Sequence, residues 1–83
     1  MNNKVLVKIF LPDMEISYDV YLPTSKRIGN IINLVLKSVL EMGIDYQISE
    51  KAIFYNRNTG ERYDPNAMLI ETNIRNGTEL ILI

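Results

Sequence analysis

The sequence predicts an α+β domain in which one helix lies across one face of a mixed sheet of four or five strands. Three observations support this prediction. Residues 24–43 carry apolar side chains at helical spacing, and the apolar segments on either side mostly alternate at strand spacing. The length of 83 residues also leaves room for only one hydrophobic core. We therefore treat residues 1–83 as a single domain with the order strand, strand, helix, strand, short strand, strand.

The segment 24–43 is the predicted helix. Its apolar stripe consists of Ile28, Ile31, Ile32, Val35, Leu36, Val39 and Met42. The opposite face carries Asn30, Asn33, Lys37 and Glu41. Thr24 and Ser25 offer side-chain oxygens for the N-cap, and Gly43 is the expected residue just after the helix. Burial contributes about 1.5–3 kcal/mol for each stripe residue. Summed over the stripe, this contribution is comparable to the entropic cost of ordering the segment. A sheet must therefore cover the stripe.

Two strands joined by a tight turn precede the helix. Lys4 and Lys8 prefer solvent, and this preference fixes which side chains of residues 5–11 face inward. Pro12-Asp13-Met14 is a turn, and residues 16–22 form the return strand of an antiparallel hairpin. The predicted inward side chains are Val5, Val7, Ile9 and Leu11 on the first strand, and Ile16, Tyr18, Val20 and Leu22 on the second.

A third strand is expected after the helix, over residues 52–56. Its facing is ambiguous, because either Phe54 or the pair Ile53 and Tyr55 can point into the core. The connection before it, residues 44–51, has no clear period, and its apolar members are placed to cap the edge of the core. A turn at residues 58–60 then leads to a short return strand. That strand covers residues 61–63 and ends at Asp64-Pro65-Asn66.

The last part of the chain returns to the middle of the sheet. Residues 67–74 are extended or form a single helical turn, with Leu69 and Ile74 as anchors in the core. The Asn76-Gly77 turn precedes the last strand, residues 78–83. Glu79 prefers solvent, so Leu80 and Leu82 point inward. We expect this strand to lie parallel to the first one, since a helical crossover separates the hairpin from the later strands.

Composition excludes several classes of function. The chain has no cysteine and no histidine, so thiolate chemistry and the commonest general base and zinc ligand are absent. A formal net charge of −1 gives no drive toward nucleic acid. No apolar run approaches the roughly 20 residues that cross a bilayer, and no signal peptide is visible. We expect a cytoplasmic protein that does not insert into membranes and has no cofactor.

Two acidic pairs are the strongest candidates for chemistry. Asp13 with Glu15, and Glu61 with Asp64, have the residue types of general acid/base pairs or hard-metal ligands. Both pairs flank predicted turns, and nothing in the sequence indicates a cleft around them. We interpret them as solvated charges. No catalytic, metal-binding or cofactor-binding residue is predicted, and we expect no enzymatic activity.

The order of elements resembles the ubiquitin-like β-grasp fold, and several local sequences are also similar. Val5-Leu6-Val7-Lys8 resembles the first strand of ubiquitin, and Ala52-Ile53-Phe54 resembles its third. Thr72-Asn73-Ile74-Arg75 followed by Thr78 is similar to the stretch before its final strand. A conjugated modifier or a sulfur carrier of this fold ends in two glycines. This sequence ends Leu80-Ile81-Leu82-Ile83, so we do not expect either activity unless the chain extends further.

Among ubiquitin-like proteins without such a tail, the chain most resembles the YukD/EsaB family of bacterial type VII secretion. The similar features are the compact length, the Leu22-Pro23 entry to the helix, the aliphatic run over residues 28–36, and the Asn76-Gly77-Thr78 turn. The resemblance implies a cytoplasmic accessory or regulatory component that binds other proteins, among them components of a membrane secretion apparatus.

The outer face of the sheet, away from the helix, is the predicted interaction surface. Its candidate residues are Leu6, Lys8, Phe10, Ile53, Ile81 and Ile83, with Ile53 included only if Phe54 faces the core. A contiguous apolar patch on this face would mark a binding site for a protein. The alternative is that scattered exposed apolar residues are normal on a half-covered sheet. Self-association, through these outer faces or through the edge of the last strand, is a further hypothesis.

Overall fold

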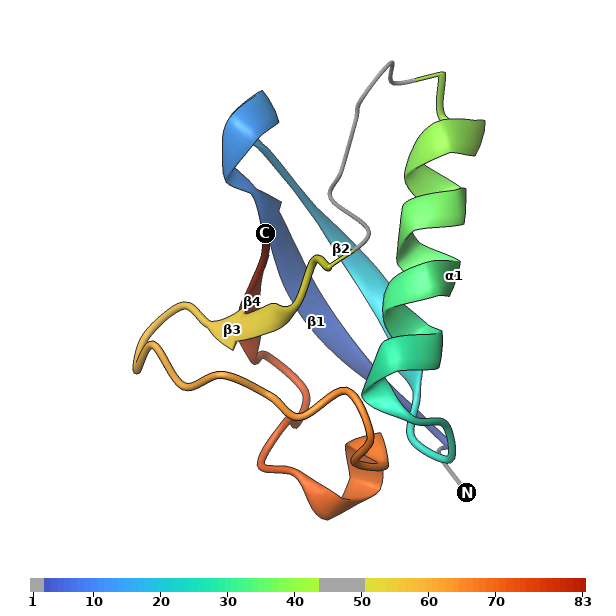
Figure 1. Cartoon of the computed structure of the whole chain (residues 1–83), viewed down its shortest axis with the longest axis vertical. Helices are drawn as coiled ribbons and strands as arrows, with labels where there is room; N and C mark the ends of the chain where they lie inside the picture. Colours follow the sequence, from blue (N-terminus) through green and yellow to red (C-terminus); the bar gives the residue numbers. More distant parts are fainter. Residues whose placement is uncertain (1–2, 44–50) are drawn as a thin grey trace.

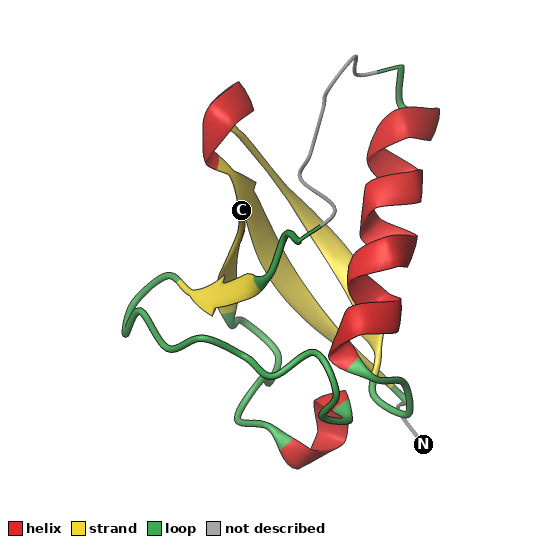
Figure 2. Ribbon diagram, viewed as in Figure 1, coloured by secondary structure: helices red, strands yellow, loops and turns green. Residues whose placement is uncertain are grey.

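The computed structural model describes residues 3–43 and 51–83, and in them four strands and one α-helix form two layers (Figure 1). The strands are β1 (Lys4–Leu11), β2 (Ile16–Pro23), β3 (Phe54–Asn56) and β4 (Glu79–Leu82), and the helix is α1 (Ile28–Glu41). Short 3-10 turns cover η1 (Pro12–Met14) and η2 (Leu69–Glu71). Figure 2 shows α1 on one side of the strands. The predicted α+β architecture is confirmed, with four strands in the sheet.

The strand order is β2-β1-β4-β3, so the first and last strands are the central pair. β1 and β4 are parallel, with Ile9 opposite Leu80, and the other two pairings are antiparallel. This arrangement confirms the predicted hairpin and the parallel placement of the last strand. Both edges of β4 are hydrogen-bonded to neighbours, so the hypothesis of self-association through the edge of the last strand is wrong.

The core lies between the inner face of the sheet and α1. Its fully buried strand residues include Ile9, Leu11, Leu80 and Leu82. Phe54 has no exposed surface, which settles the ambiguous facing of the third strand in favour of Phe54 inward. Four predicted inward residues, Val5, Ile16, Tyr18 and Val20, pack against the core but stay half-buried. The predicted anchors Leu69 and Ile74 are fully buried.

Helix α1 begins four residues later than predicted and is not capped by Thr24 or Ser25. Its N-cap is Arg27, which makes no side-chain capping bond, and the Thr24 hydroxyl donates instead to the Asn3 carbonyl. The first N–H groups of the helix are satisfied by a distant loop. The N–H of Ile28 donates to the Ala67 carbonyl (2.9 Å) and that of Gly29 to the Pro65 carbonyl (2.8 Å). Tertiary carbonyls thus replace the expected side-chain cap.

The stripe of α1 is mostly buried as predicted. Ile28, Ile31 and Ile32 and, one to two turns later, Val35 and Val39 are buried, whereas Leu36 is half-buried. Met42 was predicted on the stripe but is half exposed, because the helix ends at Glu41 and Met42 is its C-cap. Gly43 follows with φ of 77°, the left-handed conformation expected after a helix. Within residues 3–43 and 51–83, no helix is long and apolar enough to cross a membrane.

The predicted return strand over residues 61–63 is reduced to a single bridge between Tyr55 and Arg62. Tyr63 is buried instead, and its hydroxyl accepts from Asn56 Nδ2 (3.1 Å) and donates to Asn73 Oδ1 (2.8 Å). The turn at residues 58–60 is confirmed, with Gly60 at φ of 77°. The Asn56 side chain closes that turn by accepting from the N–H groups of residues 58 and 59. The predicted capping role of residues 44–50 lies outside the described residues.

The helix stripe provides a first test of the packing. Ile31→Ala should lower the free energy of unfolding by about 2–5 kcal/mol, because Ile31 is fully buried and its replacement leaves a cavity. Leu34→Ala, one turn later on the same helix and 49% exposed, should change it by less than about 0.5 kcal/mol. Urea unfolding of both variants measures the difference. Equal destabilisation would contradict the packing described.

The Tyr63 hydroxyl provides a second test, through pH. Burial raises the pKa of Tyr63, and the Glu61 charge acts in the same direction, whereas the Asn56 hydrogen bond opposes both. The unfolded chain therefore ionises first, and stability that is fully present below about pH 10 falls as pH rises further. Tyr63→Phe should lose about 1–2 kcal/mol near neutral pH, because Asn56 and Asn73 lose their partner.

The stability of the same variant should then fall less steeply above about pH 10, since it lacks the Tyr63 phenol. Thermal unfolding across this range, with the parent chain as the control, measures both effects. An unchanged stability near neutral pH together with an unchanged alkaline slope would show that the Tyr63 hydroxyl plays no part.

Candidate functional site

The outer face of the sheet is defined by the strand register. On β1 the outward residues are Leu6, Lys8 and Phe10, which alternate with the buried Val7 and Ile9. On β4 the outward residues are Glu79 and Ile81, and Ile83 continues the alternation. The parallel register places Lys8 beside Glu79 and Phe10 beside Ile81. The predicted neighbours from two different strands therefore meet on one face.

Four of the predicted residues lie together there, and we call them the outer-face cluster: Phe10, Ile53, Ile81 and Ile83. Ile81 is opposite Phe10 on one side and opposite Tyr55 on the other. Ile53 and Ile83 exchange two backbone hydrogen bonds, of 2.9 and 3.3 Å, which extend the β3–β4 ladder by one pair. Tyr55 is half-buried beside this cluster. Side chains from three regions of the sequence thus form one apolar surface.

Leu6 is separated from the outer-face cluster. A row of charged residues crosses the sheet between them, because Lys8 pairs with Asp19 on β2 and with Glu79 on β4. Leu6 is 37% exposed and lies instead opposite the exposed Tyr21. The predicted surface is therefore divided, and Lys8 belongs to the charged row between its two parts.

Arg57 is a component of this surface that the sequence did not reveal. It follows β3 directly, and its guanidinium carbon lies 3.9 Å from the centre of the Phe10 ring. Its Nη1 also lies 3.4 Å from each Glu79 carboxylate oxygen. Such cation–π and exposed ionic contacts each contribute about 0.5–1 kcal/mol or less. Arg57 thus partly covers Phe10 and links β1, β4 and the end of β3.

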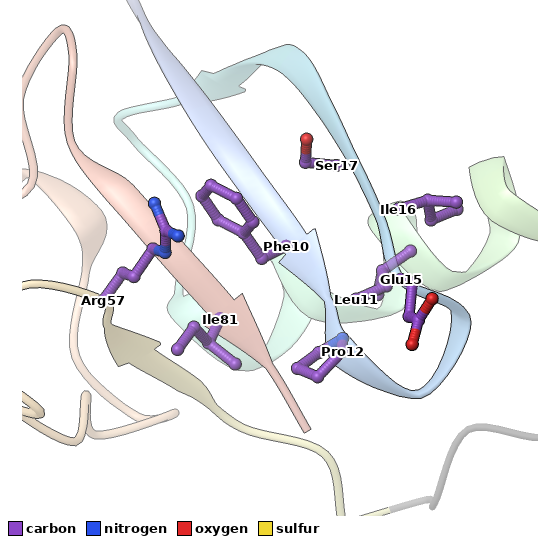
Figure 3. Close-up of a pocket in the computed structure, with 8 residues that line it drawn as sticks. All are labelled: Phe10, Leu11, Pro12, Glu15, Ile16, Ser17, Arg57 and Ile81. Carbon is purple, nitrogen blue, oxygen red and sulfur yellow. The ribbon is translucent and has the colours of Figure 1, made fainter.

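A shallow depression of about 360 Å³ opens beside the outer-face cluster, at the end of β1 (Figure 3). Apolar residues from β1 and β4 and from the turn after β1 provide most of its lining, including Phe10, Pro12 and Ile81. In Figure 3, Arg57 lies on one side of this depression and Glu15 on the opposite side. The geometry suits an apolar side chain of a ligand, with an acidic group of the ligand beside Arg57 and a basic group beside Glu15.

Three residues of the acidic pairs, Glu15, Glu61 and Asp64, have local structural roles. The Asp64 carboxylate accepts from the N–H of Asn66 (2.8 Å), and the Glu61 carboxylate accepts from Asn73 Nδ2 (3.0 Å). Glu15 has φ of 52°, the left-handed conformation that turns the chain from η1 into β2. Within the described ranges, no three acidic side chains are grouped so as to hold a metal ion.

The chain was compared with known proteins at the levels of sequence and fold. No protein-family model matches it, and no curated protein matches it by sequence. Among solved structures, the ubiquitin-like domain of EccD5 from Mycobacterium xenopi superposes with a TM-score of 0.74 at 21% identity. This alignment covers 99% of the present chain and 94% of that domain.

Two further solved structures are similar, and one of them is from a type VII secretion system protein. The ubiquitin-like domain of EccD1 from Mycobacterium tuberculosis has a TM-score of 0.70 at 20% identity, covering 100% of this chain and 99% of that one. A component of the ESX-5 inner membrane complex has a TM-score of 0.79 at 15% identity. There the alignment covers 99% of this chain but spans only 21% of that component's length. The chain therefore has the ubiquitin-like β-grasp fold and resembles the ubiquitin-like domains of type VII secretion EccD proteins.

Proposed function

We propose that this chain is a non-catalytic protein-interaction module, and that it serves as a cytoplasmic accessory or regulatory component of a bacterial type VII secretion system. The outer-face cluster holds its partner. The observation that carries this proposal is the convergence of Phe10, Ile53, Ile81 and Ile83 on the face of the sheet opposite α1. An apolar surface assembled from separate strands is typical of a protein-binding site.

The surroundings of the outer-face cluster fit a protein partner better than a small molecule. The depression beside it is shallow and lined mainly by apolar side chains, with the charged Arg57 and Glu15 on opposite sides. An apolar centre with a polar rim is the usual anatomy of a protein interface. Arg57 is also suited to such a role, because arginine is enriched at residues that dominate binding energy.

The fold comparisons support the secretion setting. The EccD1 and EccD5 domains match this chain over nearly their whole lengths, and one component of an ESX-5 inner membrane complex has the same fold in about a fifth of its length. By analogy, the partner we propose is a cytoplasmic surface of a membrane secretion component. The absence of histidine and cysteine from the sequence supports a role without chemistry.

Photo-crosslinking identifies the partner directly. A benzophenone amino acid at position 83, which is 52% exposed in the outer-face cluster, should crosslink to a type VII secretion component in the bacterial host. The matched control is position 70, because Ile70 is 63% exposed but lies on η2, away from the outer-face cluster. Adducts with the same protein from both positions, or adducts only from position 70, would contradict the assignment of this face.

A substitution tests the energetic role of the same surface. Ile81→Asp should weaken partner capture by about thirtyfold or more, since a charge placed at the centre of an apolar interface removes a dominant contact. Leu6→Asp is the matched control: it introduces the same charge on the same face of the sheet, but beyond the charged row. Melting curves verify that both variants are folded. Equal loss of capture in both would show that the two apolar regions act as one.

A further inference from the structure

Strand β2 is an edge strand, and among the described residues no strand pairs with one side of its backbone. The even-numbered residues of β1 direct their backbone groups toward β4, as shown by Lys8 N–H donating to the Thr78 carbonyl and Gly77 N–H donating to the Leu6 carbonyl. The odd-numbered residues of β1 therefore pair with β2. By the register, the backbone groups of Ser17, Asp19 and Tyr21 point to the open edge.

An apolar groove of about 170 Å³ runs beside this edge, between β2 and α1. Inward residues of β2, Tyr18, Val20 and Leu22, form one wall, and Leu34 and Ser38 of α1 are on the other. Leu34 is 49% exposed although it borders apolar surface. A strand added to β2 would place alternate side chains in this groove and the others on the outer face.

The Tyr18 hydroxyl belongs to a side chain that lines this groove. Its oxygen is buried, and it has no hydrogen-bond partner among the described residues. Burial raises the pKa of Tyr18, so the phenol keeps its proton near neutral pH. A buried hydroxyl without a partner is unfavourable. A carbonyl oxygen of an added segment would provide one only after the Tyr18 side chain turned toward the groove, because its oxygen has no accessible surface as it lies.

A second copy of the chain fits this edge poorly. Antiparallel pairing of two β2 strands with Ser17 opposite Tyr21 places the two Asp19 carboxylates directly opposite each other, which is destabilising. Shifting the pairing by two residues brings in Pro23, which has no N–H to donate, or Glu15, whose φ of 52° is not extended. The edge therefore disfavours self-pairing while leaving Asp19 open to an opposite charge.

We infer that the open edge of β2 and the adjacent groove bind an extended segment of a partner protein, with a basic residue opposite Asp19 and an apolar residue on each side of it. The basic side chain lies on the outer face beside Asp19, and the apolar side chains enter the groove next to Leu34. The backbone of the segment pairs with Ser17, Asp19 and Tyr21. This site is separate from the outer-face cluster and does not depend on the function proposed for it.

The probe is a capped synthetic peptide, Val-Thr-Val-Lys-Val-Thr-Val, whose symmetric pattern presents the same side chains in either direction. Titrated into the isotopically labelled chain, it should shift the amide resonances of residues 17–21 and slow the hydrogen exchange of the Ser17, Asp19 and Tyr21 amides. The same peptide with Asp in place of Lys should bind about tenfold more weakly, because like charges would then lie opposite each other.

Variants of the chain separate the charge from the groove. Asp19→Asn should remove the preference between the two peptides, and Asp19→Lys should reverse it. Leu34→Asp should weaken binding of the lysine peptide by about tenfold or more, because the groove loses an apolar residue from its wall. Leu40→Asp is the matched control, since Leu40 is on the same helix and 62% exposed but does not line the groove.

Three results would overturn the inference. The first is the absence of saturable shifts at residues 17–21 with either peptide, and the second is a peptide preference that Asp19→Lys leaves unchanged. The third is a dimer in light scattering that protects the same amides without peptide, since the edge would then belong to a second copy.

Discussion

The parallel pairing of β1 with β4 is the interaction on which the rest of the structure depends. It joins the first and last strands at the centre of the sheet, with Ile9 opposite Leu80 and Phe10 opposite Ile81. The first pair is fully buried in the core against α1, and the second lies on the outer face. One register therefore specifies both the core that stabilises the domain and the surface that we assign to binding.

The same topology decides which strand edges are available. Because β4 is central, it has no free edge, and the edges of the sheet are β2 and β3. β3 has three residues and is followed by the turn that carries Arg57, whereas β2 has eight residues beside an apolar groove. The two binding surfaces that we propose thus differ in their mode of contact. The outer-face cluster presents side chains, and β2 presents backbone groups with a charge at the middle of the strand.

Much of the fold could be predicted because lysines and Glu79 fix the facing of the first and last strands. The sequence could not decide whether Phe54 faces the core, since its neighbours Ile53 and Tyr55 are also apolar or aromatic. Nor could it show that carbonyls from residues 65 and 67 cap α1, or that the charged row isolates Leu6, because both depend on contacts between distant segments. Arg57 was missed for a related reason: with Phe54 inward, the alternation places residue 57 on the outer face.

The most direct test of the binding surface is methyl cross-saturation in the complex with the captured partner, because isoleucines occur in the core, in the outer-face cluster and elsewhere on the surface. With Ile δ1 methyl groups labelled in this chain, saturation of the partner should attenuate the signals of Ile53, Ile81 and Ile83. It should leave the buried Ile31 and the exposed Ile70 unchanged. Attenuation of Ile70 without Ile81 and Ile83 would show that the partner binds another face and would contradict the account.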